Sequence, residues 1–414
     1  MTVWIPEWQV TVNGGTNYTN LTLATVSITS GRTDIYSQPR AGYCFIEILN
    51  LDESPIEIDV NDNVLIKIKD STGTYVNLFG GDVTDIEVQV LNSSGTESNQ
   101  VIRVTALGAL SKLPVSLTEG VLAKDYDGNQ IYTILSDLLL NNWNEVAPAL
   151  TWADYDPAQT WATAENVGLG EIDQSGDYEL TARSASTTDV YSLISALATS
   201  GLGYIYEDSS GRISYADATH RSEYLAANGY TEISASTAFA AGIATIKRIA
   251  DVRNKVTIQY KNGQEASAID TDSVGIYGQQ AQIIGTTIEN LVDAEFQADF
   301  YLGLRAYPQA QFQAITFTLG NNNIDDSDRD ALLNVFMGLP LDINNLPPNI
   351  LLGRFQGFVE GWTFSAGYNR LDLTLNLSPT AFSLQSMKWE TVSVAEAWNT
   401  LSPTLNWNSA TIVA

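Results

Sequence analysis

Histidine is nearly missing from this chain, since His220 is the only one among 414 residues. A zinc site built on two or more imidazoles is therefore excluded, and so is the paired-histidine helix of metalloproteases. A Ser-His-Asp triad would have to use His220. That residue lies in the polar segment Asp217–Arg221 after an expected strand, where we expect a solvated loop histidine, and no Gly-x-Ser-x-Gly elbow accompanies it.

Cysteine is equally scarce, because Cys44 stands alone and cannot form an internal disulfide. Its apolar strand pattern predicts a buried, inert thiol. No apolar run reaches the length needed to cross a bilayer, and the segment Met1–Glu7 lacks the basic and apolar regions of a signal peptide. We therefore expect a folded protein made in the cytosol, without a membrane segment.

Basic residues are few: 20 Lys and Arg stand against 48 Asp and Glu, which gives a formal net charge of −28. Such a chain repels nucleic acids and anionic membranes. The acidic residues are dispersed along the chain, so they do not indicate a disordered acidic tail. Hydrophobic residues make up 44% of the sequence, which is enough for the packed cores of two to four domains.

Cofactor and metal motifs are also missing. Gly168-Leu169-Gly170 lacks the third glycine of a dinucleotide loop, and no Walker A sequence is present. The stretch Asp125–Asn129 resembles the start of a calcium loop, but its glycine comes too early and Ser136 stands where the closing glutamate belongs. We interpret it as a turn that caps a following helix, and we expect no cofactor and no metal.

One acidic and aromatic cluster keeps a carbohydrate role open. Asp154 and Asp156 lie beside Trp152 and Trp161, which is compatible with a sugar-binding module or, as a third alternative, a glycosidase. Carboxylates between aromatic residues in a loop that contains proline are more often solvated surface. The alternative function for this chain is therefore that of a carbohydrate-binding protein that recognises a host cell surface.

In residues 1–113 apolar and polar residues alternate with a period of two, and β-branched residues are enriched, as is typical of strands. Six strands separated by glycine-rich turns predict a small barrel or sandwich. Gly80-Gly81 predicts a bulge or a barrel corner. The expected strands are Val10–Val12, Leu21–Thr29, Gly42–Asn50, Val64–Asp70, Tyr75–Val90 and Gln100–Leu107.

After Leu113 the pattern mixes helices with strands, which predicts an α+β domain at 114–245. A second β region is expected at 246–378, interrupted by a helical element at about 263–309, and an extension follows at 379–414. The expected helices are Gln130–Leu139, Asp189–Ala198 (capped by Thr187 or Thr188 and ended by Gly201) and Ile288–Tyr307, and the later strands are Tyr204–Tyr206, Arg212–Tyr215, Lys255–Tyr260, Gln311–Leu319, Gly353–Thr363 and Arg370–Leu377.

Two separated motifs carry the clearest functional signal. In the first, a strand ends in a Ser-Gly-Arg corner at Gly31 and Arg32, and a Gly-aromatic strand that ends at Asn50 follows. In the second, Asp272-Ser273-Val274-Gly275-Ile276-Tyr277-Gly278 precedes a helix. Their order resembles that of bacteriophage tail baseplate hub proteins. The resemblance makes Gly31, Arg32, Tyr277 and Gly278 candidate structural residues, although each position also has an ordinary turn or surface reading.

The resemblance implies a mainly β fold with two small tail-tube-type β-barrels in each subunit. It implies three subunits in a ring, which meet a hexameric tail tube or distal tail protein on one side and tip or fibre proteins on the other. Genomic DNA would pass through without specific binding. We therefore expect a structural protein of the virion tail tip and no catalytic activity.

Overall fold

The computed structural model describes residues 4–380 of the chain, except for one long gap and several short ones. The long gap covers 143–168. The short gaps are 20–21, 51–54, 93–98, 239, 243–244, 309–310, 313, 322–323, 351–352 and 368–369.

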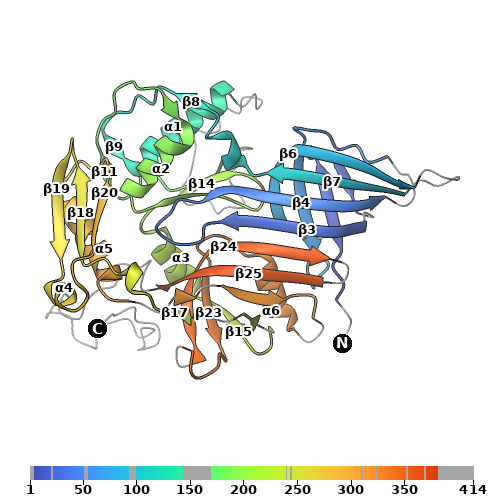
Figure 1. The fold of residues 1–414 in the computed structure, drawn as a ribbon. Helices are drawn as coiled ribbons and strands as arrows, with labels where there is room; N and C mark the ends of the chain where they lie inside the picture. The colour runs from blue at the N-terminus through green and yellow to red at the C-terminus, as the bar shows by residue number, and fades with distance from the viewer. Residues whose placement is uncertain are drawn as a thin grey trace.

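Thirteen strands from both ends of the chain form the largest sheet. At its centre β3 (Thr22–Gly31) pairs antiparallel with β24 (Phe355–Gly367), so one strand from near each end of the chain lies beside the other (Figure 1). The other strands are β1 (Trp8–Val12), β2 (Thr16–Tyr18), β4 (Arg40–Asn50), β5 (Asn63–Lys69), β6 (Tyr75–Asn92), β7 (Asn99–Leu107), β15 (Thr231–Ser234), β16 (Ala240–Ala241), β22 (Ile315–Thr318), β23 (Pro340–Asn344) and β25 (Arg370–Pro379).

All six strands expected before residue 113 are present, with ends that differ by a few residues. In β4 the residues alternate between buried and less buried, so Cys44, Ile46 and Ile48 face the core. Burial raises the pKa of the Cys44 thiol, as expected of an inert one. The first hydrophobic core lies against this sheet and takes side chains from both ends of the chain.

The mainly β fold with an α+β insertion is confirmed, but the described strands do not close into two separate barrels. They pair along an open path from β16 to β2. β3 pairs with β4 on one edge and with β24 on the other. The edge of β3 that would close an N-terminal barrel is therefore already taken by β24 of the C-terminal strands. The four domain ranges given above remain predictions.

The middle of the chain builds the α+β part around a second hydrophobic core. Helix α1 (Asp127–Asn142) packs on α2 (Val190–Ser200), and α2 packs on β13 of a sheet with the strand order β10–β14–β13. The cap of α2 is Asp189 and not the predicted Thr187 or Thr188, because the Asp189 carboxylate accepts from the Ser192 amide at 2.7 Å. The strands are β10 (Leu169–Ile172), β13 (Tyr204–Glu207) and β14 (Ile213–Ala216).

The strand Lys255–Tyr260, which we expected in the second barrel, belongs instead to a separate sheet. It is β18, and it lies between β19 (Gln264–Ile269) and β20 (Ala281–Gly285). Helix α5 (Leu291–Arg305) packs on this sheet, and its inward residues join the second core. The prediction failed because it grouped strands by their order in the sequence, whereas Val256 and Ile258 are buried with the α+β part.

Shorter elements connect these parts. They are the 3-10 helices η1 (Ala109–Lys112) and η4 (Ile249–Asp251), the helices α3 (His220–Asn228), α4 (Thr271–Tyr277) and α6 (Asp326–Leu333), and the strands β8 (Leu117–Thr118), β9 (Asp125–Tyr126), β11 (Glu179–Leu180), β12 (Thr188–Asp189), β17 (Thr245–Ile246) and β21 (Gln311–Phe312). None of the helices in the described ranges has the length and hydropathy of a membrane-spanning segment.

Candidate functional site

The Gly31 corner is a close crossing of two backbones. Gly31 has a φ of +86°, and a Cβ added to it would lie 2.4 Å from the carbonyl oxygen of Glu360 and 2.5 Å from the Cα of Gly361. A Cβ on Gly361 would in turn lie 2.6 Å from the carbonyl oxygen of Arg32. β3 and β24 can approach this closely because both positions are glycine and carry no Cβ.

A buried carboxylate joins this crossing to a third segment of the chain. Glu360, on β24, is 1% exposed and accepts from Arg32 Nε at 2.7 Å. Its carboxylate also accepts from Arg221 Nη1 at 2.7 Å and Nη2 at 3.0 Å, and from the Ser378 hydroxyl. Arg221 comes from α3, so the cluster connects the start, the middle and the end of the fold.

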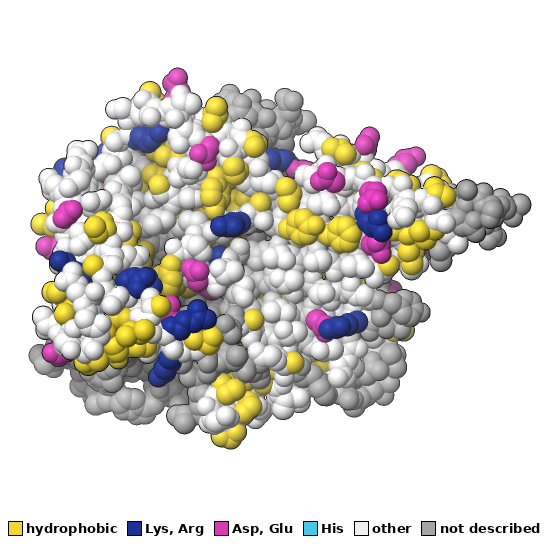
Figure 2. All heavy atoms as spheres, viewed as in Figure 1, with side chains coloured by type: hydrophobic (Ala, Val, Ile, Leu, Met, Phe, Trp, Pro, Cys, Tyr) yellow, Lys and Arg dark blue, Asp and Glu magenta, His cyan; other side chains and the backbone are white. Residues whose placement is uncertain are grey.

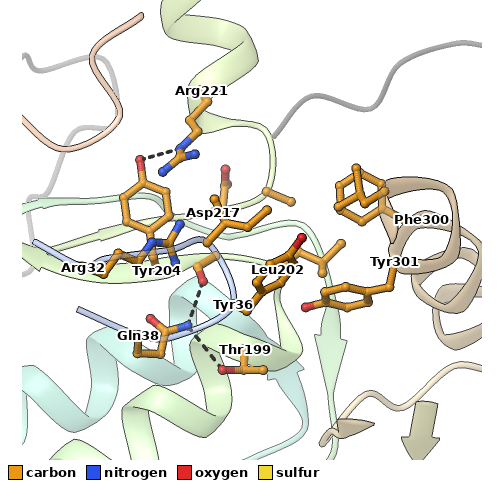
Figure 3. A pocket seen from close by; sticks show the side chains of 14 residues that line it. Arg32, Tyr36, Gln38, Thr199, Leu202, Tyr204, Asp217, Arg221, Phe300 and Tyr301 are labelled. Atoms are coloured by element: carbon orange, nitrogen blue, oxygen red, sulfur yellow. Dashed lines mark hydrogen bonds between the residues drawn. The ribbon is translucent and has the colours of Figure 1, made fainter. Parts of the chain in front are cut away.

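The Tyr204 ring lies between the two guanidinium groups (Figure 3). The ring centroid is 5.1 Å from Arg32 Cζ and 4.6 Å from Arg221 Cζ, and Arg221 Nε donates to the Tyr204 hydroxyl at 3.3 Å. Stacking on an aromatic ring lowers the cost of placing two like charges near each other. Beside this group a pocket of about 80 Å³ opens toward Phe300 and Tyr301 of α5.

The cluster holds charge and does not move protons. Burial alone would raise the pKa of Glu360, but Arg221 and Arg32 outweigh it and hold the pKa at about 2. The same pairing raises the pKa of Arg221 against the effect of burial. A carboxylate ionised at every physiological pH, between two permanent cations, is a poor general acid or base. We therefore regard these residues as a joint, and we call Arg32, Tyr204, Arg221 and Glu360 the buried joint.

Glu207 makes a second connection, to the Gly-aromatic strand. Its carboxylate accepts from the backbone amides of Gly42 at 2.9 Å and Leu110 at 2.5 Å. A Cβ on Gly42 would lie 2.8 Å from the Glu207 carboxylate, and one on Gly108 would lie 2.0 Å from it. Burial raises the pKa of Glu207 to about 7 despite these donors. The glycine before Tyr43 thus gives a carboxylate of the α+β part access to the backbone of β4.

His220 does not lie in a solvated loop, contrary to our expectation. It is the first residue of α3, its side chain is 10% exposed, and its Nδ1 lies 2.8 Å from Asp173 Oδ2. Burial opposes the charged ring, but Asp173 and the neighbouring Glu171 and Asp217 raise the pKa of His220. The expectation failed because the local sequence is polar, while Asp173, its partner, comes from a distant loop.

Several carboxylates around His220 have raised pKa values. Burial and the charge of Asp173 raise the pKa of Asp217 to about 7, and burial raises the pKa of Glu171 to about 7. Burial raises the pKa of Asp127 to about 6, although Tyr215 donates to its carboxylate. These groups lie at the base of α3, the helix that carries Arg221. We call Glu171, Asp173, Asp217 and His220 the acidic cluster.

The second motif forms a helix end remote from the buried joint. Tyr277 is the last residue of α4, and Gly278 caps it with a φ of +72°. The Gly278 carbonyl accepts from Asn254 Nδ2 at 2.8 Å, and the Tyr277 and Tyr307 rings meet edge to face at 6.3 Å. The motif thus fastens α4 to the start of β18 and to the residues after α5. The structure does not bring Gly31 and Arg32 together with Tyr277 and Gly278.

The other sequence candidates give no catalytic site in the described ranges. Trp152, Asp154, Asp156 and Trp161 lie outside the described residues. Asp125 accepts from the Tyr126 amide and from Asn129 Nδ2, at the turn into α1. Within the described part, no group of three or more His, Cys, Asp and Glu is arranged to hold a metal ion.

Glu360 and Arg221, which bind each other beside the Gly31 corner, were not predicted from the sequence. A signal for Glu360 exists in Gly357-Phe358-Val359-Glu360-Gly361-Trp362, where one carboxylate interrupts an apolar strand. A charge in such a position predicts a buried partner of opposite sign. The identity of that partner depends on the tertiary fold.

Comparison with known proteins gives the fold. No family model matches the chain, and no curated protein matches its sequence. Among solved structures, the chain resembles the 43 kDa tail protein of prophage MuSo2 from Shewanella oneidensis, at a TM-score of 0.54 and 12% identity, over 91% of this chain and 100% of that one. It also resembles the tail protein from Neisseria meningitidis MC58, at a TM-score of 0.57 and 10% identity, over 92% and 98%. The chain shares the fold of these tail proteins.

Proposed function

We propose that this chain is a structural protein of a phage or phage-like tail, and that within the tail it forms the baseplate hub. One observation carries the proposal: the described fold matches two tail proteins over more than nine-tenths of every chain compared. A fold alone does not determine a function. The chemistry of the described residues supports the same conclusion, because the buried charges of Arg32, Arg221 and Glu360 hold distant segments of the chain together.

The buried joint suits a protein that must keep its shape under load. Replacing a buried ion pair by apolar residues is often neutral, so such a pair is weak evidence for stability. In this chain, however, it ties β3, α3 and β24 at one point, and two glycines allow the backbones to meet there. A unit with its two ends and its middle fastened together can transmit a force or a contact without changing shape.

Our proposal for the assembly is a homotrimeric ring that joins the tail tube or distal tail protein to the tail tip. Genomic DNA would leave through its centre during ejection. With 48 acidic and 20 basic residues, the chain suits a channel wall that repels phosphates. We further propose that the protein has no enzymatic role.

Labelling the chain in purified particles tests this function. Particles that carry an epitope-tagged copy are treated with gold-labelled antibody and imaged, with untagged particles as the control. We expect gold at the tail tip, and tailless or tipless particles when the gene is silenced. Gold along the tube or on the head, or normal particles without the protein, would contradict the proposal.

A further inference from the structure

Most Lys and Arg side chains of the described part are already paired with a carboxylate. Those that form ion pairs are Arg32, Lys69, Arg103, Lys112, Lys124, Arg212, Arg221, Lys261, Arg329, Arg354 and Arg370. In a chain with more than twice as many acidic as basic residues, pairing of nearly every cation is the expected arrangement. A set of cations without an ion pair is therefore informative.

Five of the described cations without an ion pair come from one region. Lys247, Arg248, Arg253 and Lys255 lie within the nine residues that lead from β17 into β18, and Arg305 ends α5. The Arg253 amide donates to the Arg305 carbonyl at 2.8 Å, which joins the two segments. We call these five residues the basic patch. Arg40, Lys67 and Arg183 are the remaining cations of the described ranges that form no ion pair.

Neutral acceptors hold the two inner guanidinium groups of the basic patch. Arg253 Nη1 donates to the carbonyls of Ala250 at 2.8 Å and Val252 at 2.6 Å. Arg305 donates to the Asp251 carbonyl at 3.0 Å and to Gln282 Oε1 at 2.9 Å. These contacts fix the groups in place without an ion pair. Lys247 and Arg248 are exposed to solvent.

Apolar and aromatic side chains surround these charges. Ile249 is 59% exposed, Tyr307 is 40% exposed, and Tyr36, at 37%, stacks under Arg305 with 4.0 Å from its centroid to Arg305 Cζ. Figure 2 shows dark blue side chains gathered beside hydrophobic ones over the region of β17 and α5. Exposed Tyr and Arg with an aliphatic neighbour are typical of protein interfaces.

Four carboxylates lie close to the patch. Asp34 and Asp251 act on Tyr36 and Arg305, and Asp270 and Asp272 act on Tyr307, but none of the four forms an ion pair in the described part. Five cations against four carboxylates leave the patch with a small net positive charge. The chain as a whole carries −28, so the patch differs in sign from most of the molecule. The acidic surfaces of a second copy of this chain carry the charge that is complementary to the patch.

We propose that the basic patch is an interaction surface that binds carboxylates of a second copy of this chain. The inference rests on the proposed function, since the second copy is the neighbour in the proposed ring. It makes the contact heterologous: the patch of one subunit meets a different, acidic surface of the next, which is the type of contact that closes rings. A DNA duplex is the other anionic ligand that the patch could take, and the test below separates it from a second copy.

Self-association of the purified chain tests the inference. In sedimentation velocity, we expect the wild type to form oligomers whose dissociation constant rises as salt increases from about 0.1 M to about 1 M, because the Debye length falls from ~10 Å to ~3 Å. The double variant Lys247→Glu/Arg248→Glu should weaken association about tenfold or more and lose most of this salt dependence. The matched control Lys67→Glu/Lys69→Glu changes charge equally on β5 and should associate like the wild type.

Other outcomes would overturn the inference. A wild type that stays monomeric up to ~100 µM removes the second copy as partner. Equal association of the patch variant and the wild type, with unchanged circular dichroism, removes the patch. A fluorescent DNA duplex that binds the wild type but not the patch variant assigns the patch to nucleic acid instead.

The inference and the proposed function fail separately. If gold labels the tail tip but the patch variant associates normally, the inference is wrong and the proposed function stands. If association depends on the patch but the protein is absent from the tail tip, the proposed function is wrong and the surface still binds a second copy.

Discussion

Gly31 and Gly278 share a backbone conformation but differ in their surroundings. Both have a positive φ, of +86° and +72°. A Cβ on Gly31 would overlap the backbone of β24, whereas a Cβ on Gly278 would meet no atom within 4 Å. The same sequence signal, a glycine before a polar or aromatic turn, therefore marks a crossing of two chain ends in one case and a simple helix cap in the other. Only the crossing constrains the whole fold.

The largest effect is expected at the crossing. Gly31→Val should lower the free energy of unfolding by about 5 kcal/mol or more, at the upper end of single-substitution effects, because the neighbouring atoms belong to backbone and cannot turn away. Urea unfolding followed by tryptophan fluorescence measures this. The exposed neighbour Thr33 supplies the control: Thr33→Val should change the value by less than ~0.5 kcal/mol. Equal tolerance of both substitutions would break the comparison.

Removing the carboxylate of the buried joint should also destabilise the crossing of β3 and β24, because it removes the side-chain contacts at that crossing. Glu360→Ala leaves Arg32 and Arg221 buried without their counterion, which should cost about 3–5 kcal/mol of unfolding free energy. In hydrogen exchange, the amides of β3 and β24 should lose protection more than those of α4 and β18. A uniform loss of protection over both regions would show that the joint does not act locally.

A change of pH should change the stability of the fold through the titration of the acidic cluster. The pKa values of Glu171 and Asp217 are raised to about 7 in the folded state, so the stabilising contributions of these groups are present below the unfolded pKa values and are lost as the pH rises through about 7. The pKa of His220 is raised as well, so its contribution is also lost as the pH rises. Glu360, with its lowered pKa, contributes above about pH 4.5 and is constant in this window. We expect stability to fall by on the order of 2 kcal/mol between about pH 5.5 and about pH 8.

Thermal unfolding across this window measures the effect. The double variant Glu171→Gln/Asp217→Asn removes two of the titrations and should flatten the profile, while Asp85→Asn on the exposed part of β6 should leave it unchanged. A profile of the double variant that still matches the wild type would show that these two groups do not carry the pH dependence.

The smallest effect is expected at Gly278. Gly278→Ala should cost only about 1 kcal/mol, which is the penalty of a positive φ without overlap. Denaturant unfolding of this variant beside Gly31→Ala gives the sharpest comparison, since the substitution is identical. If Gly278→Ala proved as damaging as Gly31→Ala, space at the glycine would not explain the difference.

Local patterns in the sequence predicted local structure well. The alternation of Cys44, Ile46 and Ile48 predicted β4, and the spacing of apolar residues predicted α1, α2 and α5. The same patterns cannot say which sheet a strand joins, because Val256 and Ile258 would be equally buried in either core. This is why β18 was grouped with the wrong strands.

The candidate site was predictable only in part. Gly31 and Arg32 could be singled out, because their motif resembles that of baseplate hub proteins. Their partners Glu360 and Arg221 are brought to them by long-range pairing, which no local pattern encodes. For His220 the polar neighbours suggested solvent, since Asp173 approaches it from a loop far away in the sequence.

An electron cryomicroscopy reconstruction of the tail tip of particles that contain this chain tests the central claim most directly. The account predicts three copies around a channel with a neutral to negative wall, with the buried joint intact in each copy and most Lys and Arg side chains at subunit contacts or on outer faces. A ring of Lys or Arg lining the channel, or a tip without this protein, would contradict it.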